Sequence, residues 1–404
     1  MREQAAVVKE IRAKSILRRH RGVDAWFLGG SGMNLYRGCA HDCAYCDGRA
    51  EKYRVEGHFA DEVCVKSNAQ QILARELPPA ADPAGYSGGL FGDVPVPRGR
   101  RSKRINGFVI LGGGVGDSYQ PAEAECRLSR GALELLEERG LPVHVLTKST
   151  LVLRDADILA RINAKTRAVV SFSISTVDDE LAAVFEPGAS PPSERLAALA
   201  RLKSLGIRCG VFLLPVIPFV SDSGEAIEKS VRAAREAGAD FTAFGGMTLK
   251  EGRQKEHFFG VLKRIRPDLV EPCRKLYANR ARYGEAAGSY FKEIGGRFAA
   301  ASGRHGMPPR MPRPLFAGRI SGIELAMILM EHADAMLMLE GKSSSYRRVA
   351  ACVARFGKPV TPDNVSEIQG IGGAAAEMIR EILETGTSRL YEDLLSRRSA
   401  PASR

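Results

Sequence analysis

Three cysteines near the N-terminus are the residues whose type and spacing most directly indicate chemistry. Cys39, Cys43 and Cys46 lie within one stretch of eight residues. Thiolates are the soft ligands that iron–sulfur clusters require. A four-iron cluster has four corners, so three nearby cysteines would leave one iron without a protein ligand, and an open metal position is typical of catalytic sites. The spacing therefore predicts an iron–sulfur cluster with one reactive corner.

Two simpler interpretations remain open for these thiols. A structural zinc site uses four ligands, usually in two closely spaced pairs, and the sequence contains no second pair. The other cysteines are scattered, at Cys64, Cys126, Cys209, Cys273 and Cys352. Three unrelated core thiols are the second alternative.

The composition indicates a large protein of a reducing compartment. A chain of 404 residues exceeds the about 250–300 residues at which a single core stops growing, so we expect more than one domain. No run of about 20 apolar residues predicts a membrane span, and no secretory signal is evident. Eight cysteines in a chain of this length do not form a disulfide scaffold, and free thiols favour a cytoplasmic location.

The net charge of +12 is concentrated in two short segments. Residues 1–21 carry seven Lys or Arg against two Glu, and residues 98–104 carry five Lys or Arg and no acid. Basic runs favour polyanions such as nucleic acid. A solvated surface arm is the alternative, and charge alone supports both equally.

From about residue 33 to residue 265, short apolar runs alternate with helical patterns, which is typical of parallel β/α units. The predicted strands are Gly32–Arg37, Gly107–Gly112, Val143–Thr147, Ala168–Ile174, Ile207–Val216 and Phe241–Gly245. The predicted helices are Ala69–Glu76, Ala122–Arg139, Asp155–Asn163, Ser193–Leu205 and Ser223–Ala237. We expect an α/β fold with a partial (β/α)6 TIM-like barrel. An open doubly wound sheet is the alternative, because spacing alone does not separate the two.

Proline, glycine and charge divide the chain into further parts. We expect a basic, helical N-terminal arm at 1–27 and the barrel at 28–303, with a long loop inserted at 78–106. Four prolines between residues 308 and 314 cannot continue a helix. They predict a linker at 304–317, followed by a small all-α domain at 318–395.

Polar residues and glycines follow the predicted strands at the end where barrel active sites gather. The cysteine segment follows the first strand. The later strand ends carry Gly112, Gly113, Gly114, Asp117, Lys148 and Ser173. Glycines let the backbone approach a ligand closely. For each single residue, a rim surface group is the alternative.

The C-x3-C-x2-C spacing, with Tyr45 before the last cysteine, resembles the signature of the radical S-adenosylmethionine (SAM) superfamily. In that family the open iron is chelated by SAM, which an electron from the cluster cleaves to a 5′-deoxyadenosyl radical. The resemblance implies a 4Fe–4S cluster on the three cysteines. It also implies an external electron donor such as flavodoxin or ferredoxin.

Six blocks, in order over about residues 30–250, are similar to the spore photoproduct lyase branch, also described as DNA repair photolyase-like proteins. They are YRGC at 36–39, GDSYQPAE at 116–123, LTKS at 146–149, FSI at 172–174, FEPGASP at 185–191 and PVIP at 215–218. This resemblance implies SAM contacts at Tyr45, at the glycines after the second strand, and at Lys148 and Ser173. Asp117 is the nearest acid to the place of the usual Glu, and the segment 186–188 also matches.

One departure concerns the return of a hydrogen atom to the product. The lyase has a cysteine at the end of its second strand, whereas the run Gly112–Gly116 has no thiol. Cys126 and Tyr119 are the candidate hydrogen donors. A small buried apolar side chain is the alternative for Cys126.

Residues 364–380 resemble the helix-hairpin-helix motif, and the wider stretch is similar to the N-terminal domain of DNA polymerase beta. Gly370 and Gly372 would turn the chain so that backbone N–H groups meet a phosphate. Met378 stands at the place of the lyase nucleophile in that domain, so we predict no lyase chemistry there. The nearby cations are Lys342, Arg347 and Arg348. Residues 318–404 have equal numbers of acids and bases, so a helical packing domain is the alternative.

Together these features predict a radical SAM enzyme that acts on nucleic acid, by repair or modification of a DNA base. The base would be flipped out or single-stranded. Radical modification of RNA, a protein or a peptide is one alternative. A non-catalytic, DNA-bound iron–sulfur redox sensor is another.

Overall fold

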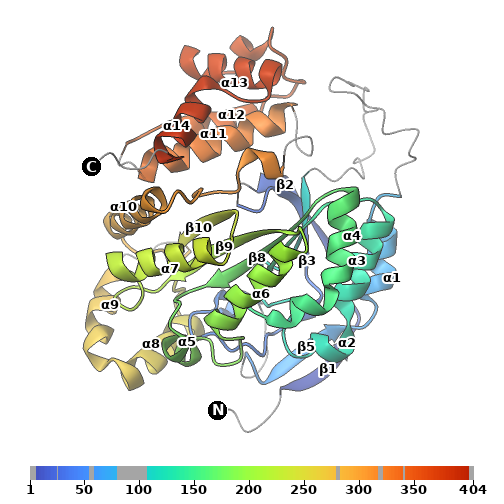
Figure 1. Ribbon diagram of the computed structural model, residues 1–404, viewed down its shortest axis with the longest axis vertical. Coiled ribbons are helices and arrows are strands. Elements are labelled where there is room, and N and C mark those ends of the chain that lie inside the picture. Colours follow the sequence, from blue (N-terminus) through green and yellow to red (C-terminus); the bar gives the residue numbers. More distant parts are fainter. Residues whose placement is uncertain are drawn as a thin grey trace.

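The computed structural model describes residues 6–24, 26–53, 59–79, 107–278, 283–316, 322–339 and 342–399. Within these ranges, helices pack on a large sheet, and a separate unit of four helices packs against this α/β part (Figure 1). The basic run 98–104 and most of the predicted loop 78–106 lie outside the described residues.

The large sheet has six parallel strands that neighbour one another in chain order. They are β3 (Gly29–Met33), β6 (Phe108–Leu111), β7 (Val143–Thr147), β8 (Ala168–Ile174), β9 (Arg208–Val216) and β10 (Phe241–Gly246), and β2 (Leu17–Asp24) adds an antiparallel edge. A doubly wound sheet reverses its strand order near the middle, and this sheet does not. The partial barrel is therefore confirmed.

Helices in the strand connections cover the outer side of the sheet (Figure 1). They include α1 (Ala69–Glu76), α3 (Leu128–Glu138), α4 (Ala156–Lys165), α5 (Asp179–Phe185), α6 (Pro192–Ser204) and α7 (Gly224–Glu236). After the last strand come α8 (Arg253–Ile265), α9 (Val270–Leu276) and α10 (Gly288–Arg304). One predicted helix, 122–139, is broken at Arg127, whose φ is 50°. The short α2 (Glu123–Cys126) precedes the break. Across the break, the buried carboxylate of Glu123 accepts a hydrogen bond from Ser129 N.

The N-terminal segment forms strands, so the expectation of a helical arm was wrong. β1 (Val7–Ile11) pairs in parallel with β5 (Glu62–Lys66), which also pairs with β4 (Tyr36–Arg37) in a small three-stranded sheet. β2 is an edge strand with exposed arginines. Positive charge is common on such edges because it prevents further strand pairing. The predicted strand 32–37 is divided between β3 and β4, which belong to different sheets.

The predicted linker is part of the core. Pro308 O accepts a hydrogen bond from Thr242 N of β10, and Met311, Leu315 and Phe316 are buried. This segment leads to α11 (Gly322–Leu339), around which α12 (Tyr346–Val353), α13 (Gly373–Thr385) and α14 (Arg389–Ser399) pack. The unit shares one apolar cluster with the first residues of β6 and β10, Phe108 and Phe241. It therefore lies towards the end of the sheet where the strands begin (Figure 1).

The expected helix before the Gly-Ile-Gly turn is only a 3-10 turn, Val365–Glu367. Pro359 and Pro362 precede it, and Asn364 holds it by accepting a bond from Thr361 N and donating one to Pro359 O. Prolines cannot supply the N–H groups of a longer helix. None of the helices in the described ranges is long and apolar enough to cross a membrane.

Candidate functional site

The segment 38–48, here called the cysteine loop, gathers three thiols in a dry environment after β4. Cys39 and Cys43 are buried and Cys46 is half-buried. Burial raises the pKa of Cys39 to about 12 and also raises the pKa values of Cys43 and Cys46. Electrostatic interactions join Cys39 to Cys46 and Cys43 to both other thiols, so the three sulfur atoms lie near one another.

This donor set fits an iron–sulfur cluster. Among the described residues, no three His, Cys, Asp or Glu side chains converge on a position for one metal ion. A cluster does not need such convergence, because each of its cysteines binds a separate iron. Phe59 and Val115 pack against Cys39 and Cys46 and provide an apolar wall.

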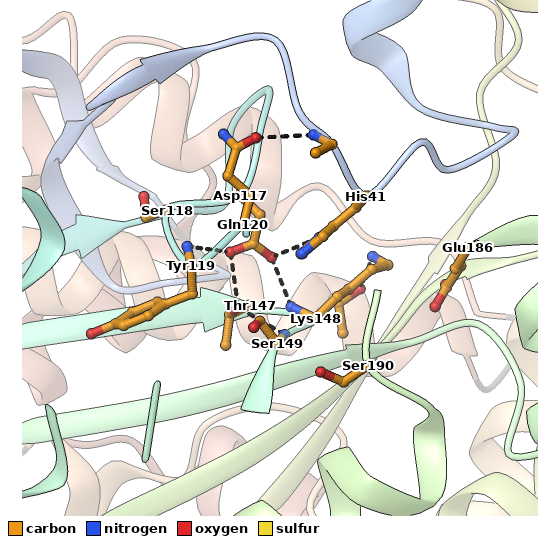
Figure 2. Close-up of polar contacts among 12 residues, drawn as sticks. His41, Asp117, Ser118, Tyr119, Gln120, Thr147, Lys148, Ser149, Glu186 and Ser190 are labelled. Carbon is orange, nitrogen blue, oxygen red and sulfur yellow. Dashed lines mark hydrogen bonds and ion pairs between the residues drawn. The ribbon is translucent and has the colours of Figure 1, made fainter. Parts of the chain in front are cut away.

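Gln120 fixes the backbone on both sides of Cys39. Its Oε1 accepts a hydrogen bond from Ala40 N (2.9 Å), and its Nε2 donates one to Gly38 O (3.2 Å). The side chain is fully buried, so these bonds are not exchanged with water. Figure 2 draws the bond between Gln120, in the segment after β6, and the backbone of the cysteine loop.

Two more side chains hold the remainder of the loop. Arg49 Nε donates to Cys43 O (3.0 Å), and its guanidinium lies 5.3 Å from the centre of the Phe59 ring. Gln254, at the start of α8, donates from Nε2 to Tyr45 O (2.9 Å). Both side chains are buried, and together they satisfy backbone carbonyls that a loop of this shape would leave unpaired.

The segment 185–190 packs along the cysteine loop. Ala44 N donates to Phe185 O (2.8 Å), and Gly188 N donates to His41 O (3.0 Å). A Cβ atom on Gly188 would lie 2.2 Å from Ala40 O, so only glycine fits this approach. Ser190 N donates to Lys148 O, which ties the segment to the end of β7.

Glu186 is a buried anion between the loop and the strand ends. Its carboxylate accepts hydrogen bonds from Tyr45 and Arg195, and from Ser175 Oγ at 2.7 Å. Burial opposes ionisation, but the charges of Arg195 and Lys148 outweigh it and lower the pKa of Glu186 to about 2. Glu186 therefore stays ionised at neutral pH, and the Tyr45 hydroxyl is held by it.

Lys148 follows β7 and Ser173 lies near the end of β8, and the two side chains meet, as their positions at the strand ends predict. Lys148 Nζ donates to Ser173 Oγ (2.7 Å), and Ser173 Oγ donates to Leu214 O (2.7 Å). Lys148 Nζ also lies 5.7 Å from the centre of the Tyr45 ring and interacts electrostatically with Cys43. A half-buried ammonium is thus placed beside the cysteine loop.

Asp117 connects three elements (Figure 2). Its Oδ1 accepts from Tyr119 N and Thr147 Oγ1, both at 2.8 Å, and its Oδ2 accepts from Lys148 N at 2.8 Å. His41 Nδ1 lies 3.5 Å from the same Oδ2. Both carboxylate oxygens already have protein donors, so a ligand would have to share them. The cofactor contact remains a prediction.

The glycines after β6 have the backbone freedom that the sequence indicates. Gly112 and Gly113 have φ values of 90° and 76°. A Cβ atom on Gly112 would lie 2.2 Å from Leu146 O, whereas Gly114 is exposed and has open space around it. The run therefore presents bare backbone beside the end of β7.

The two candidate hydrogen donors do not join this group. Tyr119 is fully buried, and Figure 2 shows its ring directed away from Lys148. Cys126 is half-buried, and burial together with Glu123, Glu125 and Glu10 raises its pKa. The break of the helix at Arg127 fixes Cys126 on the short α2, near the side chain of Tyr36.

The candidate nucleic-acid residues lie on the helical unit. Arg347 and Arg348 are exposed on α12, Lys342 is exposed before it, and Gly370 and Gly372 form an exposed turn before α13. This unit packs where the strands begin, whereas the cysteine loop and Lys148 lie where the strands end. The two groups are therefore at opposite ends of the barrel.

Sequence reasoning missed the residues that hold the cysteine loop. Gln120 is 82 residues from Gly38, and Gln254 is 209 residues from Tyr45. Local spacing carries no information on such contacts. The only available signal was that Gln120 belongs to the block 116–123.

Three comparisons with known proteins relate this geometry to a family. Residues 100–231 match the family described as the radical SAM superfamily, a stretch that contains Lys148 and Ser173 but not the cysteine loop. An uncharacterized protein of Mycobacterium tuberculosis is 31% identical over 249 residues, which are 61% of this chain and 66% of that protein. An uncharacterized protein of Methanocaldococcus jannaschii is 26% identical over 227 residues, 56% of this chain and 73% of its own length. The chain thus matches just under two thirds of the length of the mycobacterial relative.

Solved structures of spore photoproduct lyase share the fold. The lyase complexed with dinucleoside spore photoproduct superposes with a TM-score of 0.51 and 16% identity, over 77% of this chain and 80% of the lyase. A mutant of the lyase superposes with a TM-score of 0.51 and 17% identity, over 75% of this chain and 80% of the mutant. At such low identity the likeness shows the partial barrel alone.

Proposed function

We propose that this chain, of which residues 100–231 match the radical SAM superfamily, is a radical SAM enzyme whose substrate is nucleic acid. Membership of the superfamily implies a 4Fe–4S cluster and SAM as cofactors. In the proposal, Cys39, Cys43 and Cys46 bind three irons of the cluster, and the fourth iron is open to SAM.

The observation that carries the proposal is the convergence of the cysteine loop with Lys148 and Ser173. The three groups come from separate parts of the chain and are joined by Glu186, which binds Tyr45 and Arg195. Arg195 in turn donates from Nη1 to Ser173 O (2.8 Å). A fold that only buried three thiols would not need an ammonium beside them.

The residues of the chain fit the parts of SAM. When bound, the cluster and SAM supply a 5′-deoxyadenosyl radical that abstracts hydrogen from the substrate. An ammonium has three donors, one of which Lys148 gives to Ser173 Oγ, so Lys148 can also bind the methionine carboxylate. The bare backbone of Gly112–Gly114 can accept the methionine amino group. Burial of Cys39 and Cys43 would exclude water from the place where the radical forms.

Nucleic acid is the proposed substrate class because the net charge and the shared fold both favour it. The net charge is +12, which favours polyanions, and the fold is shared with a spore photoproduct lyase complexed with dinucleoside spore photoproduct. We favour DNA, with lesion repair or base modification as the reaction. An external one-electron donor such as flavodoxin or ferredoxin and a cytoplasmic location belong to the same proposal. Cys126 and Tyr119 are left out as hydrogen donors because of where they lie.

The helical unit has a separate role in this proposal. Because Gly370 and Gly372 lie at the opposite end from the cysteine loop, a phosphate bound there would belong to a part of the strand remote from the reacting base. The unit would then add affinity without positioning the base.

The test is anaerobic reconstitution with iron and sulfide, followed by reduction with SAM and incubation with irradiated DNA. We expect the wild-type protein to form 5′-deoxyadenosine and to alter the DNA, and we expect Cys43→Ala to do neither. Cys352→Ala, in the helical unit, is the matched control and should behave as wild type. Formation of 5′-deoxyadenosine without any change in DNA would favour an RNA or protein substrate. A bound cluster without SAM cleavage would favour the redox sensor.

A further inference from the structure

Three aromatic side chains border the end of the barrel at which the cysteine loop lies. Phe219 follows β9, and Tyr290 and Phe291 lie on the first turn of α10; we call these three residues the aromatic rim. The Phe219 and Tyr290 ring centres are 6.3 Å apart, and Phe291 stacks on Phe244 of β10 at 5.3 Å. Phe219 is 41% exposed and Phe291 is 42% exposed.

The backbone of Phe219 is in a conformation that bulky residues avoid. Its φ is 60°, in the left-handed region where a Cβ atom crowds the following carbonyl. The turn is fixed because Val220 N and Ser221 N both donate to Ile217 O, and Ile217 N donates to Ser221 Oγ. Strain of this kind persists mainly at sites that contact ligands. Because the ring is exposed, burial offers little compensation for the strain.

The aromatic rim is continuous with the candidate site. Ser173 Oγ donates to Leu214 O, near the end of β9. A Cβ atom on Gly245 would lie 2.6 Å from Leu214, and one on Gly246 would lie 3.1 Å from Phe291. Contacts between neighbouring residues of β9 and β10 therefore connect Ser173 to Phe291.

The fixed polar groups at the rim are paired within the protein. The Tyr290 hydroxyl donates to Asp222 Oδ2 (2.6 Å), and Arg297 Nη1 donates to Asp222 O (2.7 Å). Partly exposed aromatic rings are thus the feature that Phe219 and Phe291 offer to a ligand. Ring faces bind flat aromatic groups by stacking.

We propose that the aromatic rim stacks an unpaired nucleobase of the substrate, so that the protein selects single-stranded or flipped-out bases over paired ones. The proposal rests on the proposed function, since a base is the flat aromatic group that nucleic acid carries. Stacking on aromatic side chains is how proteins hold unpaired bases without reading their sequence. A base within a duplex has both faces covered by its neighbours and is not available to the rim.

Binding of a fluorescent single-stranded oligonucleotide and of the matching duplex, by anisotropy at one fixed salt concentration, tests the proposal. Phe219→Ala and Phe291→Ala should each weaken single-strand binding about tenfold or more and leave duplex binding unchanged. Val184→Ala, at an exposed apolar residue of α5, is the control and should change neither. Phe219→Tyr should restore binding, whereas Phe219→Leu should not. Equal single-strand binding by wild type and both alanine variants, or by Phe219→Leu, would overturn the proposal.

Phe219→Gly separates binding from folding. Glycine adopts this φ freely, so the thermal unfolding midpoint should not fall, whereas single-strand binding should weaken as in Phe219→Ala. Retention of full binding by Phe219→Gly contradicts the proposal. Uncoupled formation of 5′-deoxyadenosine by the wild type without nucleic acid tests the proposed function separately from the rim. If the wild type lacks that activity, the proposed function fails. If the wild type is active but the rim variants bind single-stranded oligonucleotide as tightly as it does, only the present inference fails.

Discussion

Single buried side chains decide where the first cysteine of the loop lies. Gln120 uses both ends of its amide, one to Ala40 N and one to Gly38 O. A carboxylate of the same shape could accept the first bond but not donate the second. The position of Cys39 thus depends on a residue that has no metal-binding chemistry of its own.

Gln120→Glu should therefore impair the cluster rather than the fold. The glutamate would face Gly38 O with a second acceptor, and an unpaired buried polar group costs about 1–3 kcal/mol. We expect less iron and sulfide per chain after reconstitution, and faster loss of the cluster in air. Gln71→Glu on α1 is a control outside the cysteine loop and should keep full iron content. Equal iron content in Gln120→Glu and wild type would show that the amide does not position Cys39.

Glu186 makes the free energy of unfolding depend on pH in the acidic range. Because Arg195 and Lys148 outweigh burial and lower its folded pKa from 4.5 to about 2, the stabilisation is fully present above pH 4.5. It is lost as the pH falls towards 2, and it amounts to about 3 kcal/mol. Glu186→Gln should lack this acid dependence and should lower the free energy of unfolding at pH 7 by about 3 kcal/mol, because Arg195 stays charged and buried.

Denaturant unfolding at several pH values measures this effect. Glu138→Gln at the surface is the control and should stay within about 0.5 kcal/mol of wild type. A Glu186→Gln protein as stable as wild type at pH 7 would contradict the role of the buried ion pair.

At the scale of elements, the strand ends were predictable and the supports of the cysteine loop were not. The apolar runs that became β7 and β8 have strong local patterns, and the polar residues at their ends, Lys148 and Ser173, follow the rule for barrel strand ends. β1 and β2 escaped prediction because they are rich in charge and lack a continuous apolar run. The segment 185–190 looked like a turn, yet its glycine is required by contact with a loop more than 140 residues away in the chain.

Gly188→Ala tests that contact between elements. The added Cβ would meet Ala40 O at 2.2 Å, so the cysteine loop or the segment 185–190 has to move. We expect a loss of about 1–3 kcal/mol in unfolding free energy, together with poor cluster incorporation. Gly260→Ala in α8, where a Cβ meets nothing within 4 Å, should be neutral or slightly stabilising. If both variants incorporate iron equally, the close approach has no consequence for the site.

For the whole molecule, the helical unit is joined to the barrel by a shared core. The sequence favours a separate domain after a proline-rich linker, because the prolines and the neutral charge indicate a boundary. They carry no information on which side chains pack across that boundary. In the structure, Phe316 belongs to the same apolar cluster as Phe108 and Leu329. The barrel and the helical unit should therefore unfold together.

Phe316→Ala tests this cooperativity. Removal of a fully buried phenyl ring should cost about 3–5 kcal/mol and should lower the single thermal transition of the entire chain. Phe356→Ala, at a partly buried ring that packs at the edge of the same cluster, should cost less. Two separate transitions, of which only one responds to Phe316→Ala, would show that the helical unit folds independently.

The proposed chemistry requires that the cysteine loop hold a four-iron cluster whose open corner binds SAM. Electron paramagnetic resonance of the reduced, anaerobically reconstituted protein, with and without SAM, tests this requirement. We predict a signal of a reduced 4Fe–4S cluster that changes on addition of SAM, and no such signal in Cys43→Ala. Protein that contains zinc in place of iron, or a cluster signal that SAM leaves unchanged, would contradict the claim.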